Sequence, residues 1–200
     1  MNTRLAIIFA ALFILAPCVW AAENKPTEEE NTLLKLILKQ SYPDGGYTVV
    51  APDTSIFGGF SDASEETKKF KSGIAANLNI FGTNNVAITE LIDRLYKRNE
   101  KPTRLTIQSV QKDGYLIDFD RKFEKYFAKD GGGWEKWYKE NPKAHGFTNI
   151  SLPVYDRMTG LVIVYKGTQS HWLAGRGNLI LYRFQNGELK ELTKAELWIS

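Results

Sequence analysis

Residue types that hold metals or form disulfides are scarce in this 200-residue chain, which has one cysteine and two histidines. The cysteine, Cys18, lies within an N-terminal apolar segment. The histidines, His145 and His171, are 26 residues apart, whereas a catalytic zinc ion typically needs three protein ligands. The sequence therefore predicts no metal site, and we expect no cofactor.

Long apolar runs are equally rare, and the one that matters lies at the N-terminus. Arg4 precedes the apolar residues Leu5 to Ala16, and Val19-Trp20-Ala21 follows them. A short positive segment, an apolar stretch of this length and acceptable residues before a cleavage point are typical of an export signal. A retained membrane helix is disfavoured because a span needs about 20 apolar residues and Pro17 interrupts this run.

Removal of this signal determines where the mature protein resides and which residues it contains. We expect residues 1–22 to be cleaved, residues 23–200 to form a single domain, and the protein to be periplasmic or secreted with no membrane span after cleavage. Lipid modification of Cys18 is disfavoured because Pro17 stands directly before it. The mature chain then has no cysteine, so it can use neither a disulfide nor a thiol nucleophile.

A strong excess of one charge is also absent. Lysine and arginine total 26 and aspartate and glutamate total 23, so loss of Arg4 with the signal leaves 25 against 23, a net charge of +2. The basic residues are scattered among acidic neighbours rather than clustered. This pattern does not favour a nucleic-acid partner.

The periodicity of apolar residues predicts both helices and strands. Helices are expected over Glu28–Gln40, where Thr27 and Glu30 form a capping box, from Ser61 or Ser64 to Ala76, over Val86–Arg98, and around the triplets Phe123, Tyr126, Phe127 and Trp134, Trp137, Tyr138. Strands are expected at Tyr47–Ala51, Leu105–Ile107, Tyr115–Phe119, Ile150–Tyr155, Leu161–Tyr165, Leu179–Phe184 and Leu189–Ile199. Asp113-Gly114 and Asn186-Gly187 indicate hairpin turns. Together these elements predict an α+β fold, a mostly antiparallel sheet of about six strands with the N-terminal and central helices packed on one face.

The last 50 or so residues resemble the C-terminal end of exported bacterial proteins of uncharacterised function. The residues that carry this resemblance are Ser151 to Tyr155, Gly160 to Gly167, Leu173 to Gly177 and Leu197 to Ser200. The resemblance implies a cell-envelope setting, and it brings no catalytic residue with it.

Few residues could carry catalysis. Ser170 beside His171 suggests acyl transfer, but adjacent residues in an extended chain point apart, and no Gly-x-Ser-x-Gly elbow is present. Asp118 and Asp120 would point to the same side of a strand, and such a carboxylate pair could serve glycoside hydrolysis. The interpretation in which Asp120 caps the following helix and Asp118 faces solvent is favoured.

The Gly-rich segment Lys166–Gly177 is predicted to be a flexible connection whose glycines permit positive φ. It lacks the glycine patterns of phosphate-binding loops and leads into a strand rather than a helix. It does hold Gln169, His171, Trp172 and Arg176. An aromatic anchor, an arginine and adaptable polar groups are what recognition surfaces use, so these four residues are the first candidate binding site.

A second candidate surface is Gly131 to Phe147, which contains Trp134, Trp137 and His145. Aromatic rings that stay exposed are good platforms for a sugar or a protein partner. At helical spacing, however, such rings are more often part of the core, and only exposure would change that interpretation.

The function that these observations favour is a non-catalytic binding or interaction protein of the cell envelope, whose partner is another envelope protein or a glycan. An envelope hydrolase that acts on a glycan or an ester is the first alternative. A purely structural domain is the second.

Overall fold

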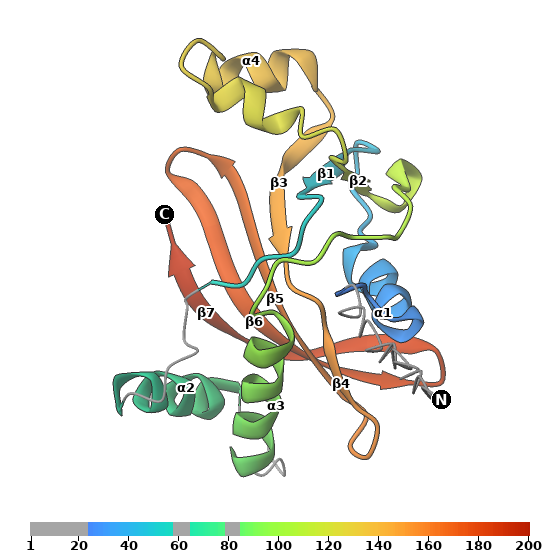
Figure 1. The fold of residues 1–200 in the computed structure, drawn as a ribbon. Coiled ribbons are helices and arrows are strands. Elements are labelled where there is room, and N and C mark those ends of the chain that lie inside the picture. Colours follow the sequence, from blue (N-terminus) through green and yellow to red (C-terminus); the bar gives the residue numbers. More distant parts are fainter. Residues whose placement is uncertain (1–23, 58–64, 79–84) are drawn as a thin grey trace, which may run out of the picture.

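The computed structural model describes residues 24–57, 65–78 and 85–200, and Figure 1 shows their fold. The helices are α1 (Glu28–Leu38), α2 (Glu65–Leu78), α3 (Asn85–Arg98) and α4 (Gly133–Glu140), with 3₁₀ turns η1 (Gln111–Asp113) and η2 (Phe123–Phe127). The strands are β1 (Tyr47–Val50), β2 (Tyr115–Ile117), β3 (Ala144–Ile150), β4 (Val154–Asp156), β5 (Leu161–His171), β6 (Ala174–Gln185) and β7 (Glu188–Ile199). The predicted α+β class is confirmed, whereas the predicted helix start at Ser61 or Ser64 lies outside the described residues.

Local chemistry explains where several elements begin. The Thr27 hydroxyl accepts a hydrogen bond from the Glu30 backbone N–H (3.1 Å), and the Glu30 carboxylate accepts one from the Thr27 N–H (2.7 Å). The predicted capping box of α1 is therefore confirmed. Asn186 and Gly187 have φ of 55° and 80°, the positive values that a tight hairpin turn between β6 and β7 requires.

The sheet is mostly antiparallel, as predicted, but one edge of it is parallel. Its order is β2-β1-β3-β5-β6-β7, with β4 paired to β5. Strand β1 runs parallel to both β2 and β3, and the other four pairings are antiparallel. A turn is present at Asp113-Gly114, where Val110 and Tyr115 form an isolated antiparallel bridge and Gly114 follows η1 with φ of 83°. The predicted hairpin is nevertheless wrong, because within the described residues no antiparallel ladder extends from the turn and β2 pairs with β1 instead. A dipeptide that favours a left-handed glycine does not fix which strand comes next.

The predicted strand at Leu105 and Ile107 is also wrong, although both side chains are buried. The segment is extended, and its backbone contacts with the chain after β1 are isolated: an Asp53–Arg104 bridge and a bond from the Leu105 N–H to the Pro52 carbonyl (2.9 Å). An alternating pattern reports burial on one side of an extended segment. It does not report whether a ladder partner is available.

The predicted flexible connection at Lys166–Gly177 is wrong, because β5 and β6 continue through it and leave only Trp172 and Leu173 between them. Gly167 and Gly177 face each other in this ladder. A Cβ added at Gly177 would lie 1.9 Å from the indole Nε1 of Trp198. These glycines therefore make room for an aromatic ring on the sheet rather than supplying flexibility or positive φ.

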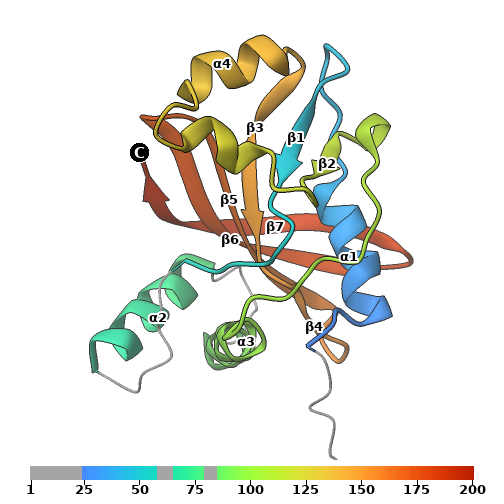
Figure 2. The same ribbon diagram turned by 45° about the horizontal axis from the view of Figure 1, so that its top comes forward.

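Helices cover both faces of the sheet. α2 and α3 pack on the face that carries Leu161, Ile163 and Tyr165, and α1 packs against Val162 and Val164 on the opposite face. Figure 2 shows α4 at one end of the sheet and α2 and α3 at the other. The expected packing on one face thus holds for α2 and α3 but not for α1, because β5 is apolar on both faces.

Candidate functional site

A polar groove lies on the face of the sheet that α1 covers, beyond the end of that helix. Val162 and Val164 lie beneath α1, and Lys166, Thr168 and Ser170 follow them on the same face because side chains alternate along β5. The groove has a volume of about 570 Å³, and its walls come from the α1–β1 connection and from strands β3, β5, β6 and β7. The face therefore changes from apolar to polar where the helix ends.

Three cationic side chains line this groove: Lys166, Arg176 and Lys194. None of them has a hydrogen-bond or ion-pair partner within the described part of the chain, and no aspartate or glutamate side chain from that part lines the groove. Arg176 and Lys194 are exposed, whereas Lys166 is partly buried. Burial lowers the pKa of Lys166 below the ordinary lysine value, an effect that the charge of Glu191 partly offsets. The groove is thus lined by three cationic side chains and, among the described residues, by no acidic side chain.

A row of threonine hydroxyls crosses the sheet into the groove. The Thr48 and Thr148 hydroxyl oxygens are 2.8 Å apart, and those of Thr148 and Thr168 are 2.9 Å apart. Thr48 and Thr148 are buried, and Thr168 lines the groove directly opposite Arg176 in the β5–β6 ladder. Buried hydroxyls need partners, and this row satisfies them through one another.

His145 forms part of the groove wall at the end nearest α1. Its Nε2 lies 2.9 Å from both carboxylate oxygens of Asp44, and its ring stacks on Tyr42 with centroids 4.2 Å apart. The hydrogen bond with His145 lowers the pKa of the Asp44 carboxyl below its usual range. The contacts with Asp44 and Tyr42 hold the imidazole in place, so the position of this part of the wall is fixed.

Five of the seven residues predicted from the sequence to bind a partner fall into three places. Arg176 and His145 line the groove. His171 and Trp172 lie at the tip of the β5–β6 hairpin, and Gln169 is paired between Phe147 and Gly175 within the sheet. The predicted loop residues thus do not border one common site, because the strand geometry sends neighbouring side chains to opposite faces.

The hairpin tip contacts the α4 region. The Trp172 ring packs edge-on against Phe127 (5.3 Å between centroids), and the His171 Nε2 lies 4.0 Å from the Glu135 carboxylate. Trp172 remains 54% exposed and Leu173 84% exposed. The tip is therefore a small exposed apolar surface, separate from the lining of the groove.

Trp134 and Trp137 are core residues rather than parts of a binding surface. Each is only 2% exposed, and they belong to an aromatic cluster with Tyr47 and Val49 of β1. The core alternative for these two tryptophans is correct, and their prediction as binding residues is wrong. Helical spacing places such rings on one face, and here that face meets the sheet.

Sequence analysis missed Lys166, Thr168 and Lys194. The signal was present in the alternation of β5, in which Val162 and Val164 on one face are followed by polar residues on that face. Alternation identifies a face only where the segment forms a strand, and the glycines of Lys166–Gly177 favour a connection instead.

The candidate catalytic residues are engaged in structural contacts. The Ser170 hydroxyl donates to the Ala174 carbonyl (3.1 Å), away from any pairing with a histidine. Asp118, which is buried, accepts hydrogen bonds from the backbone N–H groups of Lys122 and Phe123 (2.8 Å each). It is therefore Asp118 that caps the following turn, and the assignment of the cap to Asp120 is wrong; Asp120 is exposed and pairs with the Lys122 ammonium (3.1 Å).

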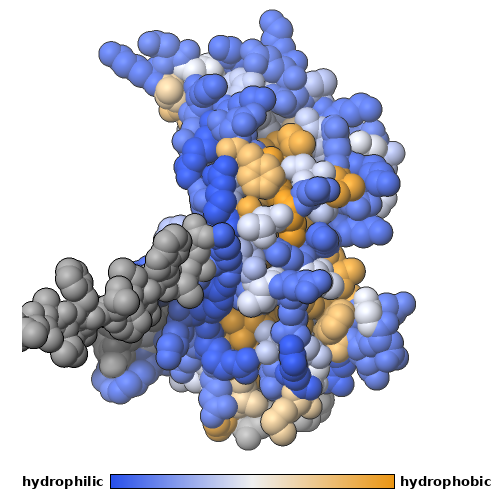
Figure 3. Space-filling model, turned by 45° about the vertical axis from the view of Figure 1, so that its right-hand side comes forward, coloured by the Kyte–Doolittle hydropathy of each residue, from blue (hydrophilic) through white to orange (hydrophobic). Residues whose placement is uncertain are grey.

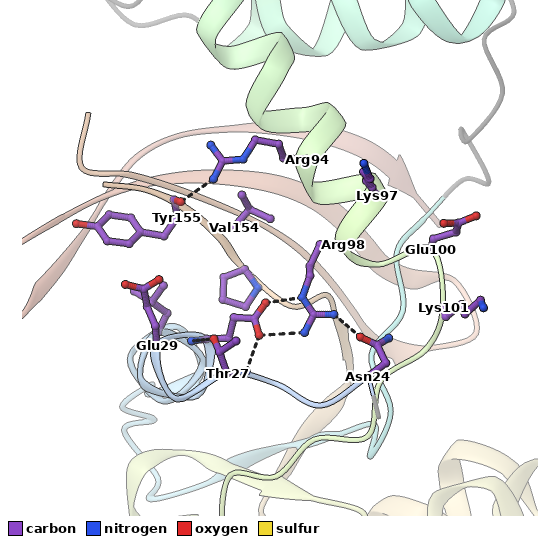
Figure 4. Close-up of a pocket in the computed structure, with 13 residues that line it drawn as sticks. Asn24, Thr27, Glu29, Arg94, Lys97, Arg98, Glu100, Lys101, Val154 and Tyr155 are labelled. Atoms are coloured by element: carbon purple, nitrogen blue, oxygen red, sulfur yellow. Dashed lines mark hydrogen bonds and ion pairs between the residues drawn. The ribbon is translucent and has the colours of Figure 1, made fainter. Parts of the chain in front are cut away.

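A second cavity, of about 730 Å³, lies between α1, α3 and β4 (Figure 4). Its central charge is already satisfied. The Arg98 guanidinium forms two bonds to the Glu30 carboxylate (2.6 and 3.0 Å) and one to the Asn24 amide oxygen (2.6 Å). Arg94 likewise donates to the Tyr155 carbonyl (2.9 Å). We assign this cavity a structural role, in which Arg98 ties the first described residues to α1 and α3.

Figure 3 shows one face of the molecular surface. Hydrophilic side chains dominate there, and the hydrophobic ones gather in small patches rather than in one continuous band. Residues 24–57, 65–78 and 85–200 contain no group of three or more His, Cys, Asp or Glu side chains placed to hold a metal ion. No helix within the same residues is long and apolar enough to cross a membrane.

Fold and groove together define an α+β protein whose mixed, mostly antiparallel sheet carries a cationic groove next to α1. Comparison with known protein families found no match, and comparisons with curated proteins and with solved structures found none either. The groove is therefore the feature from which a function can be inferred.

Proposed function

We propose that the protein is an exported, non-catalytic binding protein of the cell envelope, periplasmic or secreted, whose groove holds the anionic group of a ligand. One observation carries this proposal: three cationic side chains converge on a groove whose described walls carry no carboxylate side chain. The signal-like N-terminus and the resemblance to exported bacterial proteins support the location.

Several arginines outside the groove have carboxylate partners: Arg98 with Glu30, Arg121 with Glu124 and Asp53, and Arg157 with Glu29. An exposed cation without a partner is ordinary, but the partly buried Lys166 loses hydration, and the charge of Glu191 offsets that loss only in part. A ligand carboxylate or phosphate would supply the missing charge-assisted hydrogen bonds.

The direct test is titration calorimetry of the purified protein with carboxylate- and phosphate-bearing compounds, and the variants are Lys166→Met and Arg176→Gln. Each variant is expected to weaken binding, since each removes one charge-assisted contact. Lys68→Met is the matched control, because Lys68 lies on α2 outside the groove and pairs with Glu65. If no anionic compound binds, or if both groove variants bind as the wild type does, the proposal is wrong.

A further inference from the structure

The hydroxyl row that enters the groove has one direction in which all three of its contacts are hydrogen bonds. The Thr48 hydroxyl donates to the Gly146 carbonyl (3.2 Å), which has no proton to return. Each hydroxyl has one proton to donate. Thr48 must therefore accept from Thr148 (2.8 Å), and Thr148 must accept from Thr168 (2.9 Å). The Thr168 proton points into the sheet, away from the groove.

Thr168 consequently presents only lone pairs to the groove. Ser170, the next residue on that wall, is in the same position because its proton is donated to the Ala174 carbonyl (3.1 Å). Arg176 stands directly opposite Thr168 in the ladder, and Lys166 lies two residues before it on the same strand. One stretch of groove therefore offers two hydroxyl acceptors beside two cationic donors.

We infer that the ligand carries neutral hydroxyl groups next to its anionic group, which makes an acidic sugar the chemical class that fits. The ligand's anion would pair with Lys166 and Arg176, and its hydroxyls would donate to Thr168 and Ser170. A ligand ammonium could also donate, but the three cations of the groove would repel it. A bare anion would leave both acceptors to water, which the hydroxyls of a sugar would replace.

The size and the wall of the groove agree with this class. A volume of about 570 Å³ falls within the range of about 300–1,000 Å³ that small-molecule sites occupy, and it exceeds what a bare anion fills. The stacked Tyr42 and His145 rings form part of the same wall. This inference rests on the proposed function, because it takes the groove to be the binding site.

The test compares three ligands of similar ring size on the purified protein: glucuronate, glucose and cyclohexanecarboxylate, which has the carboxylate but no hydroxyls. Two hydrogen bonds of ordinary strength separate the first from the third, so we expect glucuronate to bind about tenfold more tightly than cyclohexanecarboxylate. Glucose is expected to bind more weakly than glucuronate. Glucose 6-phosphate in place of glucuronate tells whether the anion is a phosphate or a carboxylate, and tighter binding of either than of glucose supports the inference.

Two variants at one position separate the hydroxyl from the rest of the side chain. Thr168→Val is expected to lower the affinity for glucuronate by about two- to tenfold and to leave the affinity for cyclohexanecarboxylate unchanged. Thr168→Ser keeps the hydroxyl and is expected to retain the preference. Thermal melting of both variants checks that they fold.

The outcomes distinguish a failure of the inference from a failure of the proposed function. If neither anionic sugar nor cyclohexanecarboxylate binds, the proposed function fails. If cyclohexanecarboxylate binds as tightly as glucuronate, or if Thr168→Val leaves their ratio unchanged, the inference is overturned while the anion site stands. If glucose binds as tightly as glucuronate, the anionic group plays no part and both are overturned.

Discussion

Replacement of Lys166 by methionine should change stability and ligand affinity in opposite directions. Lys166 is partly buried, has no partner among the described residues, and has its pKa lowered by burial. Methionine has a similar length without the charge, so Lys166→Met removes the cost of desolvating an ammonium while keeping most of the packing. A residue that serves only the fold would show a loss of stability instead.

The two magnitudes follow from different interactions. Removing an unpaired, partly buried charge at a binding site should raise the free energy of unfolding by about 0.5–2 kcal/mol. Losing one hydrogen bond to a charged group should cost the ligand about 1.5–3 kcal/mol of binding free energy, which corresponds to an affinity that is weaker by about 10- to 150-fold.

Urea unfolding with linear extrapolation measures the first quantity, and titration calorimetry with glucuronate measures the second. Lys68→Met serves as the control and should change neither by more than about 0.5 kcal/mol, because Lys68 is an exposed residue outside the groove. A Lys166→Met protein that is less stable by 1 kcal/mol or more, or that binds glucuronate as the wild type does, would refute the reasoning.

Three further predictions follow from the same contacts. The pKa of Lys166 is lowered in the folded state, so the unfolded chain binds this proton more tightly. Wild-type stability should therefore rise relative to Lys166→Met as pH increases toward the ordinary lysine pKa of about 10.4. Unfolding curves at several pH values should show the difference in unfolding free energy between the two proteins becoming smaller, and a difference that grows with pH would contradict the assignment. Arg98→Met should lower the free energy of unfolding by about 1–3 kcal/mol. The substitution leaves the Glu30 carboxylate, whose side chain is only 12% exposed, without its bidentate partner. A change below 0.5 kcal/mol in urea unfolding would argue against a structural role for the cavity between α1, α3 and β4. Trp172→Ala should lower the free energy of unfolding by about 1 kcal/mol, because the edge-on contact with Phe127 is lost. It should change the affinity for glucuronate less than twofold. A large loss of affinity would mean that the hairpin tip and the groove are one site.

Features set by neighbouring residues could be predicted from the sequence. The capping box at Thr27 and Glu30 and the turn at Asn186 and Gly187 each depend on chemistry within four residues, and the structure confirms both. The α+β class also followed, because helical and alternating patterns report local burial. Long antiparallel hairpins such as β6–β7 are specified by the turn between their strands.

Features set by distant partners could not be predicted. The parallel pairing of β1 with β2 and β3 joins segments about 67 and 97 residues apart, and nothing in the turn at Gly114 specifies it. The groove could not be predicted for the same reason, because it forms only when Lys166, Arg176 and His145 come together from three separate segments. Two of its residues were identified for their chemical type, whereas Lys166 was missed because its segment was not recognised as a strand.

The central claim is that an anionic sugar binds in the groove, and an NMR titration of the purified, isotopically labelled protein with glucuronate tests it most directly. The account predicts saturable shifts of the backbone amide resonances that cluster at Lys166, Thr168 and Arg176 and that disappear in Lys166→Met. Shifts that cluster instead at Trp172, or the absence of any saturable shift, would contradict it.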